Sequence, residues 1–127
     1  MSKAIKNDET WFIFGIRADG TFGGLHMTWL DEGAPPAKIE LTDPDTGEVL
    51  NSKKMRGSKT GAHIAIAMVD QPKRLIVGEG IETVLAVWTS YIAASRAIDD
   101  MAFWAAGDLG NMAGRASDTI RHPTLKR

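Results

Sequence analysis

The spacing of hydrophobic positions changes at Ile81 from a strand pattern to a helical one. Before that point, residues 75–77 are a short apolar run, which is typical of a buried strand. After it, apolar residues recur at helical spacing along one stripe: Ile81, Val84, Leu85, Trp88 and Ile92. This pattern predicts an amphipathic helix that ends near Ile98. Residues 78–80, with the sequence Gly-Glu-Gly, are expected to form a tight turn between the strand and the helix.

The N-terminal half has strand-like patterns. Residues 11–16 are a continuous apolar run, and residues 24–30 and 62–68 alternate between two faces. Asp19-Gly20 indicates a turn, so the first two strands should form a hairpin. His26, on the polar face of the second strand, is interpreted as structural. Residues 31–38 are predicted to be a loop, and residues 43–48 a β-turn without the further ligands of a calcium loop.

The C-terminal half completes a strand–helix–strand unit. Residues 101–106 predict a buried strand, parallel to residues 75–77 through a right-handed crossover. A turn at 107–110, a short helix at 111–119 and an exposed tail at 120–127 should follow. The expected fold class is mixed α/β: a β-rich part (residues 1–70) packed beside an α/β unit (residues 71–127), together forming one compact domain.

Composition narrows the class of protein. The 127 residues are 43% hydrophobic and 24% charged, which is ordinary for a soluble globular domain. The net charge of -1 gives no overall basic field, and the absence of cysteine excludes disulfides and thiolate zinc sites. The uncharged run 83–95 is too short to span a membrane, and the N-terminus has no apolar signal segment. We therefore expect a cytoplasmic protein with no membrane partner.

Glu79 is the main candidate for chemistry. It is expected at the carboxyl end of a strand, where ligands bind in open α/β sheets, and beside a helix N-terminus, which favours negative charge. Gly78 and Gly80 would leave room for a substrate or a hydrated metal. Asp108 should follow the next strand at the same edge. Alternatively, Glu79 merely favours the helix dipole and the glycines make a turn; the residues alone leave both interpretations open.

Positive charge gathers in residues 51–61, which contain no acid and are expected to form a loop bounded by glycine. The candidate contacts to nucleic-acid phosphates are Lys53, Lys54, Arg56 and Lys59. The alternative is a solvated loop that offsets the acidic segment 40–48. A P-loop is rejected, because Ser58 stands where that motif needs glycine before the lysine.

The ordered motifs resemble those of a known family. Residues 79–83, Glu-Gly-Ile-Glu-Thr, between an apolar strand and an apolar helix, look like the glutamate motif of Toprim domains, closest to those of phage and plasmid DNA primases and primase-helicases. Residues 24–30, 53–57 and 106–111 are similar to the segments around the motif in that group. The resemblance covers about residues 24 to 114.

The resemblance implies a parallel sheet flanked by helices and magnesium-dependent phosphodiester formation or cleavage. It implies that Glu79 is the general acid or base, with Glu82 secondary, and that a later Asp-x-Asp motif binds metal. No Asp-x-Asp follows Glu79 here; Asp108 stands alone. We therefore expect the first half of a Toprim domain, in which Glu79 and Asp108 bind Mg²⁺ weakly and the isolated chain is inactive.

The parent protein implied by the resemblance is a nucleotidyltransferase of DNA replication. Its partners would be nucleic acid, nucleotides and a helicase domain or subunit. A noncatalytic module that binds nucleic acid or protein is the alternative. A dinucleotide-binding fingerprint is rejected, because Thr83 occupies the third glycine position and Glu79 would repel a pyrophosphate.

Overall fold

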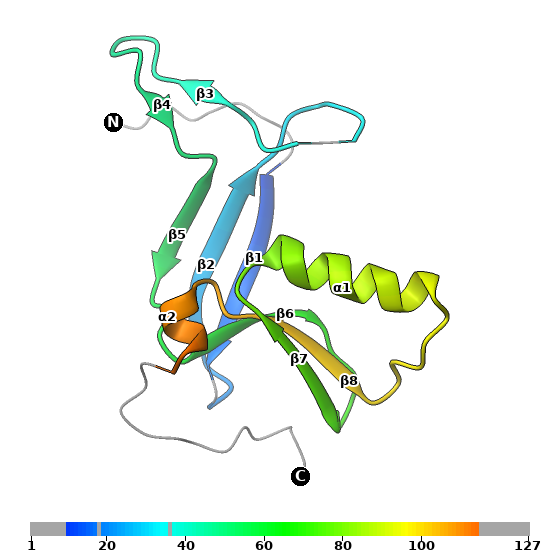
Figure 1. The fold of residues 1–127 in the computed structure, drawn as a ribbon. Helices are drawn as coiled ribbons and strands as arrows, with labels where there is room; N and C mark the ends of the chain where they lie inside the picture. The colour runs from blue at the N-terminus through cyan, green and yellow to red at the C-terminus, as the bar shows by residue number, and fades with distance from the viewer. Residues whose placement is uncertain (1–9, 18, 36, 115–127) are drawn as a thin grey trace. The chain divides into compact units, whose positions relative to one another are not determined.

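The computed structural model of the chain describes residues 10–17, 19–35 and 37–114. Strands outnumber helices (Figure 1). One sheet has six strands in the order β5-β2-β1-β6-β8-β7, and a second sheet pairs β3 with β4. The strands are β1 (Thr10–Arg17), β2 (Phe22–Trp29), β3 (Leu41–Thr42), β4 (Val49–Leu50), β5 (Lys53–Gly57), β6 (Ala62–Ala67), β7 (Arg74–Gly78) and β8 (Met101–Ala105). The helices are α1 (Ile81–Ala93) and α2 (Leu109–Met112). The predicted mixed α/β class is confirmed.

The described residues form two compact units. The first unit holds residues 10–13 and 25–56, and the second unit holds residues 14–24 and 57–114. Strands β1 and β2 therefore each contribute residues to both units.

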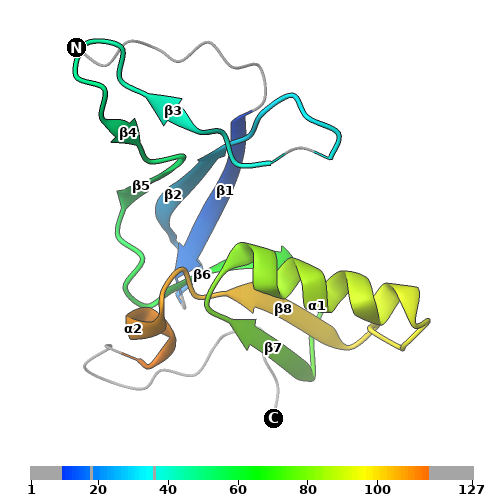
Figure 2. The same ribbon diagram turned by 45° about the horizontal axis from the view of Figure 1, so that its top comes forward.

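The second unit contains the predicted strand–helix–strand arrangement. Strands β7 and β8 are parallel, with Leu75 opposite Ala102 and Val77 opposite Trp104. Helix α1 connects them (Figure 2). Strand β8 also pairs antiparallel with β6, so the unit is not purely parallel. The local signal of an apolar run followed by a helical period was sufficient to predict this part of the fold.

Helix α1 is shorter than predicted, because it ends at Ala93 and not near Ile98. Ser95 has a φ of 51°, in the left-handed region, and its N–H donates to the carbonyl oxygen of Ile92. A single left-handed residue just past the last turn is a common way for a helix to end. The sequence around Ser95 contains no glycine or proline and gave no sign of this turn.

The inward face of α1 also differs from the predicted stripe. Ile81 and Val84 are buried as expected, but Leu85 and Ile92 are 37% and 49% exposed. Tyr91 packs instead, meeting the ring of Phe103 edge-on at 5.8 Å between ring centroids. One helix on a narrow sheet can bury only a narrow line of side chains, and residues on the flanks of the stripe stay in water.

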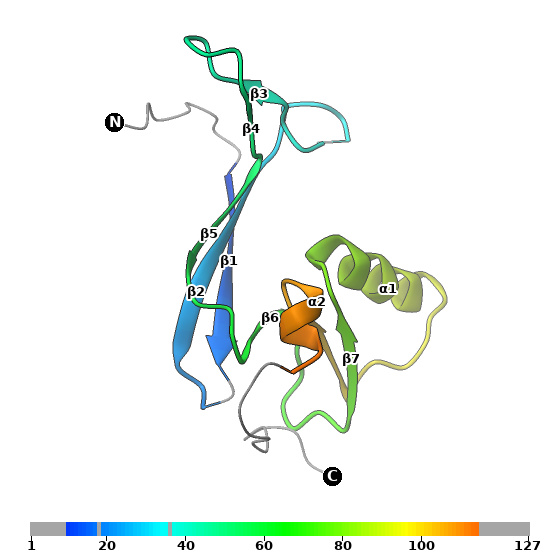
Figure 3. The ribbon, with the colours of Figure 1, turned by 60° about the vertical axis from the view of Figure 1, so that its left-hand side comes forward.

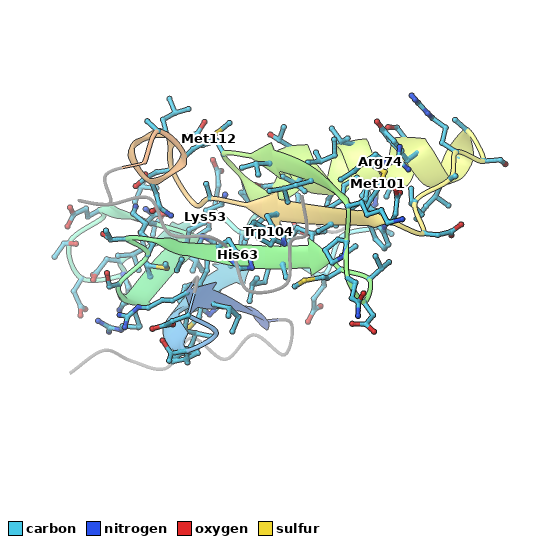
Figure 4. The ribbon with its side chains drawn as sticks, turned by 90° about the horizontal axis from the view of Figure 1, so that it is seen from below. Lys53, His63, Arg74, Met101, Trp104 and Met112 are labelled. Carbon is cyan, nitrogen blue, oxygen red and sulfur yellow. The ribbon has the colours of Figure 1, made fainter. Side chains whose placement is uncertain are left out.

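The core of the second unit is built on β8. Every residue from 101 to 106 is buried, and Phe103 is 1% exposed. On the face of β8 opposite to Phe103, the Trp104 ring stacks on that of buried His63, with 3.8 Å between ring centroids (Figure 4). A strand that is covered on both faces reads as a continuous apolar run, which explains why residues 101–106 were predicted correctly.

The first unit is mostly strands and turns. The turn predicted at residues 43–48 joins β3 to β4, and the Asp43 carboxylate accepts the backbone N–H groups of Asp45 and Thr46. The loop predicted at residues 51–61 is partly wrong, because β5 occupies residues 53–57 next to β2. Pairing with a distant strand outweighs the weak strand preference of a lysine-rich segment.

Helix α2 begins two residues before the short helix predicted at 111–119 and ends at Met112, with Ala113 as its C-cap, so the predicted helix is wrong at 113 and 114. Residues 115–119 of that prediction lie outside the described residues. The tail predicted at 120–127 lies outside the described residues.

Candidate functional site

Glu79 lies at the point where the sequence predicted it. It directly follows β7, its side chain is exposed, and the next residue, Gly80, is the N-cap of α1. Gly80 provides no side-chain cap, so negative charge near the first turn comes from Glu79 and from Glu82, the acid of that turn. Such a helix end carries partial positive charge and stabilises a nearby carboxylate.

The turns after β7 and β8 are joined by backbone hydrogen bonds. The N–H of Gly107 donates to the carbonyl oxygen of Glu79 at 2.8 Å, and the N–H of Ala106 donates to that of Gly78, also at 2.8 Å. Figure 3 shows α2, which follows the second turn, beside the carboxyl end of β7. The backbones that carry Glu79 and Asp108 are therefore neighbours at one edge of the sheet, as expected for parallel strands.

Gly78 serves helix packing and does not make room for a ligand. A Cβ atom built on Gly78 would lie 2.7 Å from Cγ2 of Val84, on α1. The prediction that this glycine clears space beside Glu79 is therefore wrong: a side chain there would collide with the helix. At Gly80 a Cβ would meet only Oε2 of Glu82, at 3.6 Å, so the space on that side is open apart from the neighbouring carboxylate.

Asp108 is already engaged by two groups. Its Oδ1 accepts the N–H of Asn111 at 2.7 Å, which makes Asp108 the N-cap of α2. Its Oδ2 forms an ion pair with Nζ of Lys59, and the two side chains are 38% and 43% exposed, respectively. A bound cation at Asp108 would have to compete with the Lys59 ammonium group.

Asn111 fixes this arrangement. Its Oδ1 accepts the N–H of Gly61 at 2.9 Å, and its Nδ2 donates to the carbonyl oxygens of Ala62 and Ala106, each at 2.8 Å. One side chain thus ties the turn before β6 to the end of β8. Lys59 lies just before the turn that leads into β6, and Asp108 lies just after the end of β8. By joining these two segments, Asn111 keeps Lys59 and Asp108 close enough to form their ion pair.

Sequence reasoning missed this role of Asn111 and the pairing of Lys59 with Asp108. A local signal existed, since an Asp three residues before Asn111 is typical of an N-cap. No local signal indicated that Asn111 also reaches residues 61 and 62, about fifty positions earlier.

The four predicted cations are divided between the two units. Lys53, Lys54 and Arg56 belong to β5 in the first unit, whereas Lys59 belongs to the second. Along β5, Lys53 is half-buried while Lys54 and Arg56 are exposed. Side chains of a strand alternate between its faces, so Lys54 and Arg56 share one face and Lys53 lies on the other.

The residues present do not amount to a magnesium site by themselves. Across the described residues, no group of three or more His, Asp or Glu side chains is placed to hold a metal ion. Glu79 and Asp108 offer two carboxylates, and one of them is paired with Lys59. Mg²⁺ is usually held by one or two carboxylates together with water and substrate phosphates. The site therefore fits the ion only if a substrate supplies the remaining ligands.

No helix in the described part of the chain has the length and apolar content that a membrane crossing needs. Comparison with known proteins gives no matching protein-family model, no matching curated protein and no matching solved structure.

Proposed function

We propose that the chain carries part of the active site of a Toprim-type nucleotidyl-transfer protein, of the kind found in phage and plasmid DNA primases. Glu79 would be the general acid or base of that site, and Asp108 a weak second carboxylate for Mg²⁺. The observation that carries the proposal is the hydrogen bond from Gly107 N–H to Glu79 O, which joins the two carboxylate-bearing turns. The motif resemblance supplies the reaction class.

The chemistry assigned to Glu79 is a proton transfer. In primer synthesis, an attacking hydroxyl oxygen forms a bond to the α-phosphorus of a nucleoside triphosphate, and the bond from that phosphorus to the bridging oxygen of pyrophosphate breaks. The hydroxyl proton goes to a carboxylate acting as general base. Glu79 suits this task because it is exposed at a strand end and has Gly80 beside it. Mg²⁺, when bound with substrate, would polarise the phosphate.

The test compares two matched variants, Glu79→Gln and Glu82→Gln. Both remove one carboxylate charge from the same four-residue stretch, 79–82, and keep the side-chain shape. Proton transfer by a positioned carboxylate contributes about a hundred- to ten-thousand-fold to a rate. We expect Glu79→Gln to lose nucleotide incorporation by that factor, and Glu82→Gln to lose much less. The assay measures magnesium-dependent incorporation on a single-stranded template by a longer protein that contains this chain, because the isolated chain is expected to be inactive.

Thermal melting of both variants is the control for folding. If Glu79→Gln incorporates nucleotides as fast as the unmodified protein, Glu79 is only a charge at the helix N-terminus, and the catalytic assignment fails.

A second candidate is a noncatalytic module that binds nucleic acid or protein. The ion pair of Lys59 with Asp108 supports the absence of catalysis, because it reduces the capacity of Asp108 to hold a metal. In that case the protein binds single-stranded nucleic acid in a salt-dependent manner, and Glu79→Gln leaves binding unchanged. Replacing Lys53, Lys54, Arg56 and Lys59 together by Ala should remove most of this binding.

A further inference from the structure

The outer edge of β7 is open in the part of the chain that the structure describes. In the six-stranded sheet, β7 is the last strand, and β8 is its pairing partner (Figure 1). Proteins usually protect such edges with proline, bulges or charges within the strand. The middle of β7, residues 75–77, is Leu-Ile-Val and has none of these.

The direction of the backbone groups on β7 follows from two hydrogen bonds. Arg74 N–H donates to the carbonyl oxygen of Asp100, and the carbonyl oxygen of Gly78 accepts from Ala106 N–H. Residues 74 and 78 therefore direct their backbone groups to the β8 side. Because these groups alternate along a strand, those of Leu75 and Val77 are directed to the open edge. Two N–H and two C=O groups are thus available to a further strand.

The side chains of the same two residues form an exposed apolar surface. Gly78 faces Val84 on α1, so the even-numbered positions of β7 face the helix. Leu75 and Val77 lie on the opposite face and are 36% and 40% exposed. Single exposed apolar residues are common, but two on an unpaired edge strand indicate a surface that a partner covers.

Charges flank this apolar surface with opposite signs. Lys73 stands just before β7 and Glu79 just after it, and both are exposed. Arg74, the other cation at this end, is already bonded to Asp100 at 2.9 Å. Along the chain, positions 73, 75, 77 and 79 are positive, apolar, apolar and negative. Only Leu75 and Val77 offer outward backbone groups, because the N–H of Lys73 donates to the carbonyl oxygen of Asp100 and the carbonyl oxygen of Glu79 accepts from Gly107 N–H. In a second copy of β7 that runs in the opposite direction, the positive and negative ends exchange places and the apolar middle stays apolar.

We propose that β7 is a docking edge for a second copy of this chain, which adds its own β7 antiparallel with Ile76 opposite Ile76. In this register Leu75 of one copy lies opposite Val77 of the other, and their outward N–H and C=O groups exchange hydrogen bonds. Lys73 of each copy lies opposite Glu79 of the other. The interface is related by a two-fold axis and closes on itself.

Charge selects this register over the other two that the backbone permits. A register with Leu75 opposite Leu75, or one with Val77 opposite Val77, also brings outward N–H and C=O groups of the two strands together. However, neither register places Lys73 opposite Glu79. Opposite charges directly across an antiparallel pair stabilise it, whereas like charges destabilise it. The arrangement also brings a lysine of the second copy to the carboxylate that the proposed function uses, although the inference does not rest on that function.

The dimer should be weak and dependent on concentration, because an interface built on one short strand is smaller than a standard protein interface. Sedimentation velocity over a range of concentrations up to the millimolar measures it directly. We expect a monomer–dimer equilibrium for the unmodified chain. The charge-reversal variants Lys73→Glu and Glu79→Lys should each weaken the dimer about tenfold or more, because each replaces both attractions by repulsions.

Two combinations of these variants restore the opposite charges, and they distinguish a loss of this pairing from a general loss of structure. An equimolar mixture of Lys73→Glu with Glu79→Lys should form heterodimers, and the double variant carrying both changes on one chain should dimerise like the unmodified chain. A chain that sediments as a monomer at every concentration overturns the proposal. So do single variants that dimerise as strongly as the unmodified chain, or combinations that fail to restore the dimer while remaining folded by circular dichroism.

Discussion

The two units differ in burial. Every residue from 101 to 106 in the second unit is buried, whereas the first unit has no buried residue in the part whose burial is described. The second unit stacks α1 on its strands, so Phe103 and Val84 are each 1% exposed. The first unit contains no helix among its described residues, and its apolar Val49 and Leu50 are 74% and 38% exposed. A core needs two layers, because a single sheet leaves one face in water. The buried apolar side chains of the described residues therefore lie in the second unit, most of them on β6, α1 and β8.

The largest expected effect is on the core of the second unit. Phe103→Ala removes a fully buried ring that touches Tyr91 and should reduce the free energy of unfolding by about 3–5 kcal/mol. Val49→Ala, in the first unit, should change it by no more than about 0.5 kcal/mol, because that side chain is exposed. Urea denaturation followed by tryptophan fluorescence measures both. A Val49→Ala cost comparable to that of Phe103→Ala would show that the first unit has a core of its own.

A smaller effect is expected where the helix meets the sheet. Gly78→Ala places a methyl group 2.7 Å from Cγ2 of Val84 and should cost about 1–3 kcal/mol through overpacking. The same substitution should cost clearly less in a Val84→Ala background, because the colliding methyl group is then absent. A double-mutant cycle of the four proteins measures this coupling. Equal costs in both backgrounds would mean that Gly78 is needed for its backbone conformation and not for close packing.

The smallest effect concerns acid stability, for which Asp100 in the second unit can be compared with Asp43 in the first. The hydrogen bonds from Arg74 lower the pKa of Asp100 below its ordinary value of 3.8, and backbone N–H groups, first that of Thr46, lower the pKa of Asp43. A carboxylate whose pKa is lower in the folded state stabilises the fold at pH values above its unfolded-state pKa, which is near 3.8. That stabilisation is lost as the pH falls through the folded-state pKa. Both groups are exposed, so the contributions are small.

Carbon-detected NMR titration should give both carboxylates a pKa below 3.8. Arg74→Gln should raise the pKa of Asp100 and leave that of Asp43 unchanged. If Asp100 keeps its low pKa without Arg74, the ion pair is not the cause. If the pKa of Asp43 moves as well, the two units are not electrostatically independent.

The sequence by itself determined the elements whose signals are local. The apolar run at residues 75–77, the change to helical period at Ile81 and the run at residues 101–106 were sufficient to predict β7, α1 and β8. They also placed Glu79 in the turn at a strand's carboxyl end. Each of these signals depends on the periods of strand and helix, which act over a few neighbouring residues.

Strand pairing, side-chain packing and the ion pair depend on residues far apart in the chain, so only the tertiary structure shows them. It made the lysine-rich segment a strand by pairing it with β2, directed Gly78 to Val84, and used Asn111 to hold Lys59 at Asp108. It also set the strand order that leaves β7 at the edge of the sheet, with Lys73 and Glu79 at its two ends. Periodicity does not specify partners, because the same strand can pair with many others until the packing of the whole sheet selects one.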